Sequence, residues 1–162
     1  MGRREAAPSV RIRSASPGEM RLDVSKTTLM AYFRDYAASS AEPSAARIAA
    51  FYADSFIVAG PRGSAVFKND TNFLDWLRHL YEFNQQVGLV SMDVVSVEEP
   101  SPLSPLHVLT TVVWGARFRK IRDQLITFRI TYLLENSNDH WKIIAYISEK
   151  DQETEMRKFG LL

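Results

Sequence analysis

The chain has 162 residues, of which 46% are hydrophobic and 24% are charged, and its formal net charge is +1. This length and composition are typical of one globular domain that buries its own core. The absence of cysteine excludes disulfides, thiol nucleophiles and thiolate metal sites, and no apolar run is long enough to cross a membrane. We therefore expect a cytoplasmic protein that does not interact with a membrane.

Residues 1–26 differ in charge and composition from the rest of the chain. They carry a net charge of +3, whereas the remainder carries −2. Pro8, Pro17, Gly18 and scattered serines leave few large apolar side chains, so the segment buries too little surface to offset the entropy of ordering. We predict a disordered leader over 1–26. The slightly acidic remainder offers no basic surface for a nucleic acid.

The first half of the remaining chain is predicted to be mainly helical. From Thr27 onward, apolar side chains recur at spacings of three and four across 29–37. Pro43 suits the first turn of a second helix. A short apolar strand is predicted over 55–59, and a second one over 65–67 after a glycine- and proline-containing turn.

A third helix is predicted to follow Asn69 or Asp70. The side-chain oxygen of either residue can accept hydrogen bonds from the free backbone N–H groups at the start of a helix. The apolar side chains then recur with helical spacing. The predicted apolar stripe consists of Phe73, Trp76, Leu77, Leu80 and Asn84.

Four longer strands are predicted after Gly88. Alternating residues indicate a strand over 90–96, and longer apolar runs indicate strands over 106–118, 125–135 and 141–148. The residues at 136–139 are typical of a tight turn between the last two strands. Helices followed by hairpin-connected strands predict an α+β fold with a curved antiparallel sheet wrapped around the N-terminal helices.

The order of these elements resembles the nuclear transport factor 2-like superfamily, which includes SnoaL-like proteins and ketosteroid isomerases. Two short sequences carry the resemblance, Phe51–Phe56 before the first turn and Asn138–Ile144 at the start of the last strand. The resemblance covers about 27–150 and leaves 151–162 as a charged C-terminal tail, for which a short helix is an open alternative. It implies a cone-shaped barrel with an apolar pocket between sheet and helices, and a homodimer formed through the convex sheet face.

The resemblance does not extend to the catalytic groups of ketosteroid isomerases. Those enzymes use a carboxylate base after the first short strand and a protonated acid in a later strand. The corresponding positions here fall at about Ala59–Gly60 and Thr131, which carry no carboxyl group. Only the tyrosine of the first helix has a counterpart, Tyr32 or Tyr36. The sequence therefore assigns no catalysis.

The resemblance does imply which residues would line the pocket. Arg129 stands between two threonines on one face of its strand, and the comparison places that face inside the cone. A guanidinium there would hold a carboxylate by a bidentate pair of hydrogen bonds. The candidate ligand-pocket residues are Tyr32, Tyr36, Trp76, Trp114, Arg129, Thr131 and Tyr146.

No motif for a metal, a nucleotide or another cofactor is present, and none is expected. His107 is predicted to lie at a strand edge without a partner. Three functions stay open. The first is a module that binds a small apolar or acidic ligand. The second is an isomerase, lyase or cyclase acting on an aromatic or polycyclic substrate, and the third is a dimeric protein-interaction domain.

Overall fold

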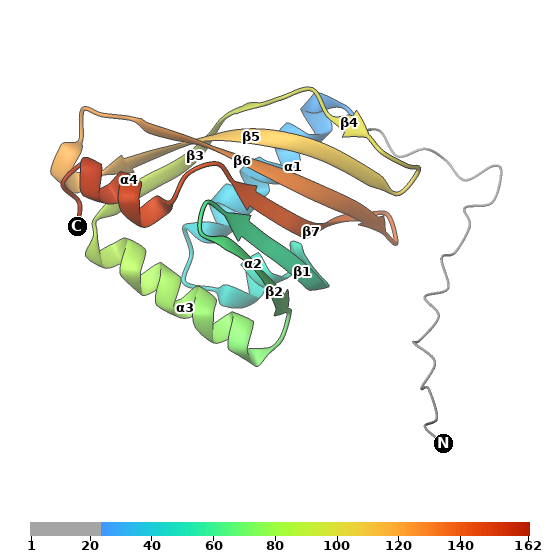
Figure 1. The fold of residues 1–162 in the computed structure, drawn as a ribbon, viewed down its shortest axis with the longest axis horizontal. Helices are drawn as coiled ribbons and strands as arrows, with labels where there is room; N and C mark the ends of the chain where they lie inside the picture. Colours follow the sequence, from blue (N-terminus) through green and yellow to red (C-terminus); the bar gives the residue numbers. More distant parts are fainter. Residues whose placement is uncertain (1–23) are drawn as a thin grey trace, which may run out of the picture.

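The computed structural model describes residues 24–162, so most of the predicted leader lies outside the described residues (Figure 1). One sheet of seven strands has the order β2-β1-β7-β6-β5-β3, with β4 paired to β5. The helices are α1 (Lys26–Ser40), α2 (Ala45–Ala49), α3 (Thr71–Gln86), η1 (Arg119–Ile121) and α4 (Gln152–Lys158). The strands are β1 (Tyr52–Gly60), β2 (Gly63–Lys68), β3 (Leu89–Val97), β4 (Ser101–Pro102), β5 (His107–Phe118), β6 (Ile126–Ser137) and β7 (His140–Ser148).

The α+β cone fold predicted from the sequence is confirmed. The sheet is curved and does not close, because its order ends at β2 on one side and at β3 on the other. One pairing differs from the antiparallel expectation, since β1 and β7 run parallel. These two strands are far apart in the chain and are not joined by a hairpin, so nothing forces them to run in opposite directions.

Side-chain caps mark the start of α1, α3 and α4. Ser25 accepts a hydrogen bond from the Thr28 N–H at the start of α1. Asp70 accepts bonds from two backbone N–H groups at the start of α3, one of them 3.0 Å long, as the sequence predicted. Asp151 caps α4 in the same way. Each cap satisfies N–H groups that have no partner within the helix.

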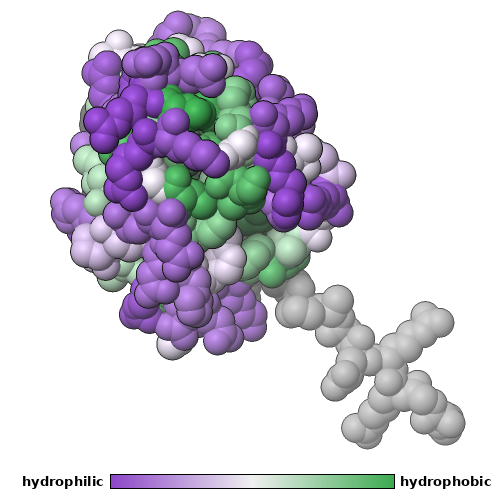
Figure 2. Space-filling model, turned by 90° about the vertical axis from the view of Figure 1, so that its left-hand side faces the viewer, coloured by the Kyte–Doolittle hydropathy of each residue, from purple (hydrophilic) through white to green (hydrophobic). Residues whose placement is uncertain are grey.

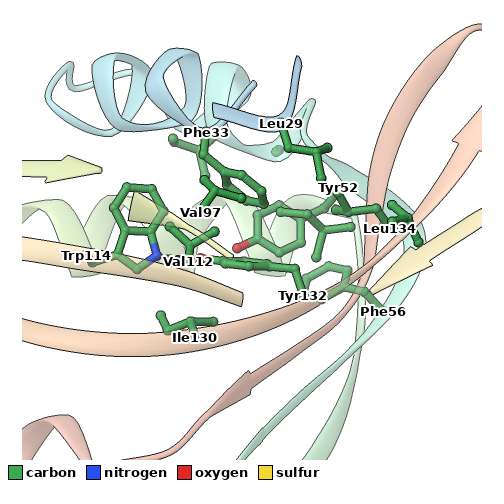
Figure 3. Packing of buried hydrophobic residues seen from close by; sticks show 14 of the residues in the cluster. Leu29, Phe33, Tyr52, Phe56, Val97, Val112, Trp114, Ile130, Tyr132 and Leu134 are labelled. Carbon is green, nitrogen blue, oxygen red and sulfur yellow. Dashed lines mark hydrogen bonds between the residues drawn. The ribbon is translucent and has the colours of Figure 1, made fainter. Parts of the chain in front are cut away.

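The main core lies between α1 and the concave face of the sheet (Figure 3). Phe33 of α1 is fully buried and points at the sheet, where its ring lies 4.7 Å from Tyr132 and 6.1 Å from Trp114. The Trp114 indole N–H donates a 3.1 Å hydrogen bond to the Tyr132 hydroxyl. The buried polar atoms of this aromatic group are therefore paired with each other.

A second, smaller core cluster lies at the end of the sheet where α4 packs. Met156 of α4 is 5% exposed and packs with Ala116 and Phe118 of β5. The segment predicted as a charged tail therefore contains a helix that buries an apolar side chain. Among residues 24–162, no helix is both long enough and apolar enough to cross a membrane.

Candidate functional site

A cavity of about 180 Å³ lies where the two core clusters meet. The sheet contributes inward-facing residues of β3, β5, β6 and β7, and the helices contribute one residue of α1, two of α3 and part of α4. Its aromatic lining consists of Tyr36, Trp114, Phe118, Phe128, Tyr132, Tyr146 and Phe159. Its aliphatic lining consists of Leu80, Leu89, Met92, Ala116, Ile126, Ile130 and Met156. The cavity is therefore mainly apolar, like most small-molecule sites.

Figure 2 looks onto the end of the molecule that carries α4, where hydrophobic side chains gather in a hollow surrounded by hydrophilic ones. The position of this hollow agrees with the cavity, whose lining includes Leu80 and Asn84 from the second half of α3 and Gln152 and Phe159 from the C-terminal segment. The charged residues in the cavity lining are Lys150 and Glu155. A rim of polar groups around an apolar interior is the usual form of a ligand site.

Three tyrosines give the cavity its interior polar atoms. The Tyr36 hydroxyl is 2.8 Å from the hydroxyl of Tyr52, and the Tyr132 hydroxyl accepts from Trp114. The Tyr146 hydroxyl has no hydrogen-bond partner among residues 24–162. Burial raises the pKa of all three phenols, and the neighbouring Tyr36 phenol raises the pKa of Tyr132 and Tyr146 further. The three groups are therefore neutral hydrogen-bond donors, not bases.

Burial also raises the pKa of Tyr32 and Tyr52, and this predicts alkaline destabilisation. Between the unfolded pKa, about 10, and the higher folded pKa, the unfolded chain binds fewer protons than the native chain. The free energy of unfolding should thus be insensitive to these tyrosines below about pH 10. It should then fall by roughly 1.4 kcal/mol per pH unit for each of them. Denaturant titrations at increasing pH measure this fall, and a free energy of unfolding that stays constant above pH 10 would contradict it.

The charged groups at the cavity are paired with each other. The Lys150 ammonium lies 3.8 Å from the Glu155 carboxylate, which also accepts a 2.9 Å hydrogen bond from Lys158. The hydrogen bond from Lys158 lowers the pKa of Glu155, and Lys150 lowers it further. Glu155 is therefore an ionised ion-pair partner, and the cavity lining holds no unpaired carboxylate that would act as a general base.

The structure brings together three of the seven residues predicted from the sequence and leaves the other four outside the cavity. Tyr36, Trp114 and Tyr146 line the cavity. The Tyr32 hydroxyl instead donates to the backbone carbonyls of Phe51 and Trp141, at 3.2 and 3.3 Å. Trp76 is 48% exposed and lies outside the cavity, where its ring stacks on Phe73 and lies 6.1 Å from that of Phe67 on β2.

Arg129 and Thr131 lie on the opposite, outer face of the sheet. Neither residue lines the cavity; the inward neighbours Ile130 and Tyr132 do. Arg129 pairs with Glu98 and, at 3.0 Å, with Glu149. The Thr131 hydroxyl is 2.8 Å from that of Thr111 on β5. The physical reason is that the more apolar face of β6 is the one that packs on the core, so Arg129 and Thr131 point outward. Thr127, near the start of β6, still contributes to the cavity lining.

The outer face also carries apolar side chains. Ile57, Ala145, Leu133 and Leu109 form one row across four neighbouring strands in the observed register. Ile57 and Ile147 on this side are each more than two-fifths exposed. The homodimer that the family resemblance implies would use this face. It stays a prediction, which the mass of the particle in solution would test.

Several cavity residues escaped the sequence reasoning. Met92 was assigned to a strand without a role, and Asn84 only to a helix stripe. Met156 and Phe159 lie in a segment of mostly charged residues, so the sequence did not indicate a role for them. Their apolar side chains three positions apart, after the capping residue Asp151, are the signal that would have revealed an amphipathic helix.

His107 has two partners, contrary to the sequence-based expectation. Its Nδ1 atom is 2.7 Å from the Ser104 hydroxyl and its Nε2 atom is 3.1 Å from the Glu135 carboxylate. The Ser104 oxygen also accepts from the backbone N–H groups of Leu106 and His107, both at 3.1 Å. Both lone pairs of this oxygen are thus engaged in capping a turn, which argues against a nucleophilic serine. Within residues 24–162, no group of three or more acidic or histidine side chains is arranged to hold a metal.

Comparison with known proteins gives a family and a fold. Residues 23–151 match the family described as NTF2-like protein (DUF6841). No curated protein matches the chain. A domain of unknown function with a cystatin-like fold from Nostoc punctiforme superposes with a TM-score of 0.62 at 12% identity, over 85% of this chain and 83% of the other.

Two further solved structures have the same fold. An NTF-2 like protein of unknown function from Shewanella oneidensis has a TM-score of 0.59 at 14% identity, over 77% of this chain and 97% of the other. A ketosteroid isomerase-like protein from Erwinia carotovora atroseptica has a TM-score of 0.54 at 16% identity, over 80% and 98%. Similarity at this level of identity shows a shared fold and leaves function to the site itself.

Proposed function

The chain belongs to the NTF2-like family DUF6841, and from that premise we propose that it binds a small apolar molecule in the cavity inside its cone. The observation that carries the proposal is an aromatic-lined cavity between two otherwise well-packed core clusters. Protein interiors are close-packed, and an empty apolar cavity costs stability. A cavity retained in this position is therefore best explained by an occupant.

The same lining argues for binding without catalysis. The polar side chains deepest in the lining are phenols whose raised pKa keeps them neutral, and the carboxylate at the rim is held by two lysines. An isomerase, lyase or cyclase needs a group that accepts a proton from its substrate. The described lining supplies none that is free, so we place enzyme function second.

A screen of small aromatic compounds by thermal unfolding tests the proposal. A ligand that binds only the native protein, at ten times its dissociation constant, stabilises by about 1.4 kcal/mol. For a chain of this length the midpoint should then rise by roughly 3–6 °C. A panel of one- and two-ring compounds that leaves the midpoint unchanged would count against a small-molecule site.

A variant that fills the cavity locates the binding. Ala116→Phe adds a ring from β5 into the space, so the stabilising effect of any ligand found should disappear. Val66→Phe is the matched control, because Val66 is 75% exposed on β2, away from the cavity. Equal ligand binding by both variants would place the ligand elsewhere.

A further inference from the structure

The size of the cavity restricts the ligand to about one aromatic ring. An apolar cavity of about 150 Å³ in another protein accommodates benzene, and the cavity here is about 180 Å³. The extra volume corresponds to a short substituent, not to further fused rings.

The charges around the cavity favour a neutral ligand. A buried carboxylate needs a cation that is free to pair with it, because its transfer out of water is otherwise very costly. Lys150 is the only cationic residue in the described lining, and it lies 3.8 Å from Glu155. Arg129, which the sequence suggested as the partner of an acidic ligand, is engaged by Glu98 and Glu149 on the outer face.

The polar atoms of the interior favour a ligand with an acceptor oxygen. The phenol of Tyr146 lines the cavity and has no partner among residues 24–162. The Tyr132 hydroxyl accepts from Trp114, and its own proton has no acceptor in the same part of the chain. The Tyr146 side chain borders the open space of the cavity, so a ligand acceptor placed there can accept a hydrogen bond from its hydroxyl. Because burial raises their pKa, the phenols do not ionise at physiological pH and each keeps a proton to donate.

We infer that the cavity binds a neutral, single-ring aromatic compound whose acceptor oxygen, such as a ketone carbonyl, accepts a hydrogen bond from the Tyr146 hydroxyl. This inference rests on the proposed function and names the class of ligand. Tyr146 is a binding residue in this scheme. The aromatic side chains around it, Trp114 and Phe128 among them, supply the apolar contact.

The test compares three probes of similar size: ethylbenzene, acetophenone and benzoate. Their dissociation constants are measured by calorimetry or ligand-observed NMR for the wild-type protein, for Tyr146→Phe and for Tyr32→Phe. The last variant is the matched control, because the Tyr32 hydroxyl donates to backbone carbonyls and does not line the cavity.

We expect the wild-type protein to bind acetophenone about two- to tenfold more tightly than ethylbenzene, the range of one net hydrogen bond, and to bind benzoate most weakly. Tyr146→Phe should erase the preference for acetophenone and leave ethylbenzene binding unchanged. Tyr32→Phe should keep the preference.

The outcomes separate this inference from the proposed function. Equal binding of acetophenone and ethylbenzene by the wild-type protein would contradict the claim that the ligand carries an acceptor oxygen. The proposal of an apolar binding site would remain. If benzoate bound most tightly of the three probes, the claim that the ligand is neutral would be wrong. A preference that survives in Tyr146→Phe would overturn the role of Tyr146. Binding of none of the three probes would overturn both the inference and the small-molecule site beneath it.

Discussion

Replacing Phe33 by alanine is expected to lower the free energy of unfolding by about 3–5 kcal/mol, a large part of the about 5–15 kcal/mol that stabilises a typical domain. Phe33 is 0% exposed, and its ring packs against three aromatic rings, those of Tyr32, Trp114 and Tyr132. It joins α1 to the concave face of the sheet, so its removal leaves a cavity that the fixed strands cannot close. Denaturant titration measures the loss.

Val66→Ala provides the control for the same measurement. It removes fewer atoms from a side chain that is three-quarters exposed on an outer strand, and its effect should stay within about 0.5 kcal/mol. If Phe33→Ala cost no more than this control, the packing of α1 against β5 and β6 would not be what holds the cone together.

The order of elements could be predicted because each one carries its own local signal. The capping carboxylate of Asp70 marks the start of α3, and Gly88, at a positive φ of 80°, marks the change from helix to strand. Asn138 and Asp139 adopt the left-handed conformation in the turn between β6 and β7, with φ of 51° and 64°. Asparagine and aspartate tolerate that conformation better than most residues, so the sequence of the turn was sufficient.

The direction in which β6 faces was harder to predict. Alternation showed that Arg129 shares a face with Thr131 and that Ile130 shares the other with Tyr132, and the structure agrees on both pairs. Which face lies inside depends on what packs against it. The family comparison placed Arg129 inside, whereas burial favours the more apolar face. A shift of one residue in such a comparison reverses every side chain of a strand, so hydrophobicity was the better guide.

The cavity itself could be predicted only in part. Tyr36, Trp114 and Tyr146 could be named because they lie in elements with clear periodicity. The contribution of α4 could not be predicted, because its short amphipathic pattern lies among charged residues. Its apolar side chain is buried only against a surface that the folded sheet provides. Met156 meets Ala116 and Phe118 only once β5 has folded.

That dependence makes Met156→Ala the sharpest test of how the cavity is closed. Met156 is the one buried residue of α4. Deleting most of its side chain should lower the free energy that holds α4 against the sheet by about 2–5 kcal/mol. The remaining contacts of this segment are exposed ion pairs, such as Arg62 with Asp151, and the packing of the partly buried Leu161 against the same cluster. A helix of seven residues is not stable by itself in water. We therefore expect α4 to detach while the sheet and α1 stay folded.

Hydrogen exchange followed by mass spectrometry resolves this outcome. In Met156→Ala, the amides of α4 should exchange at least about tenfold faster, since about 1.4 kcal/mol corresponds to each factor of ten. The amides of β5 and β6 should keep their protection.

Lys158→Ala is the matched control: it removes only the exposed ion pair with Glu155 and should leave α4 protected. Unchanged protection of α4 in Met156→Ala would show that another contact seats the helix, and uniform loss of protection would show that α4 is part of the global core. In the expected case, affinity for any ligand of the cavity should fall with the protection of α4, because Met156 and Phe159 form part of its lining.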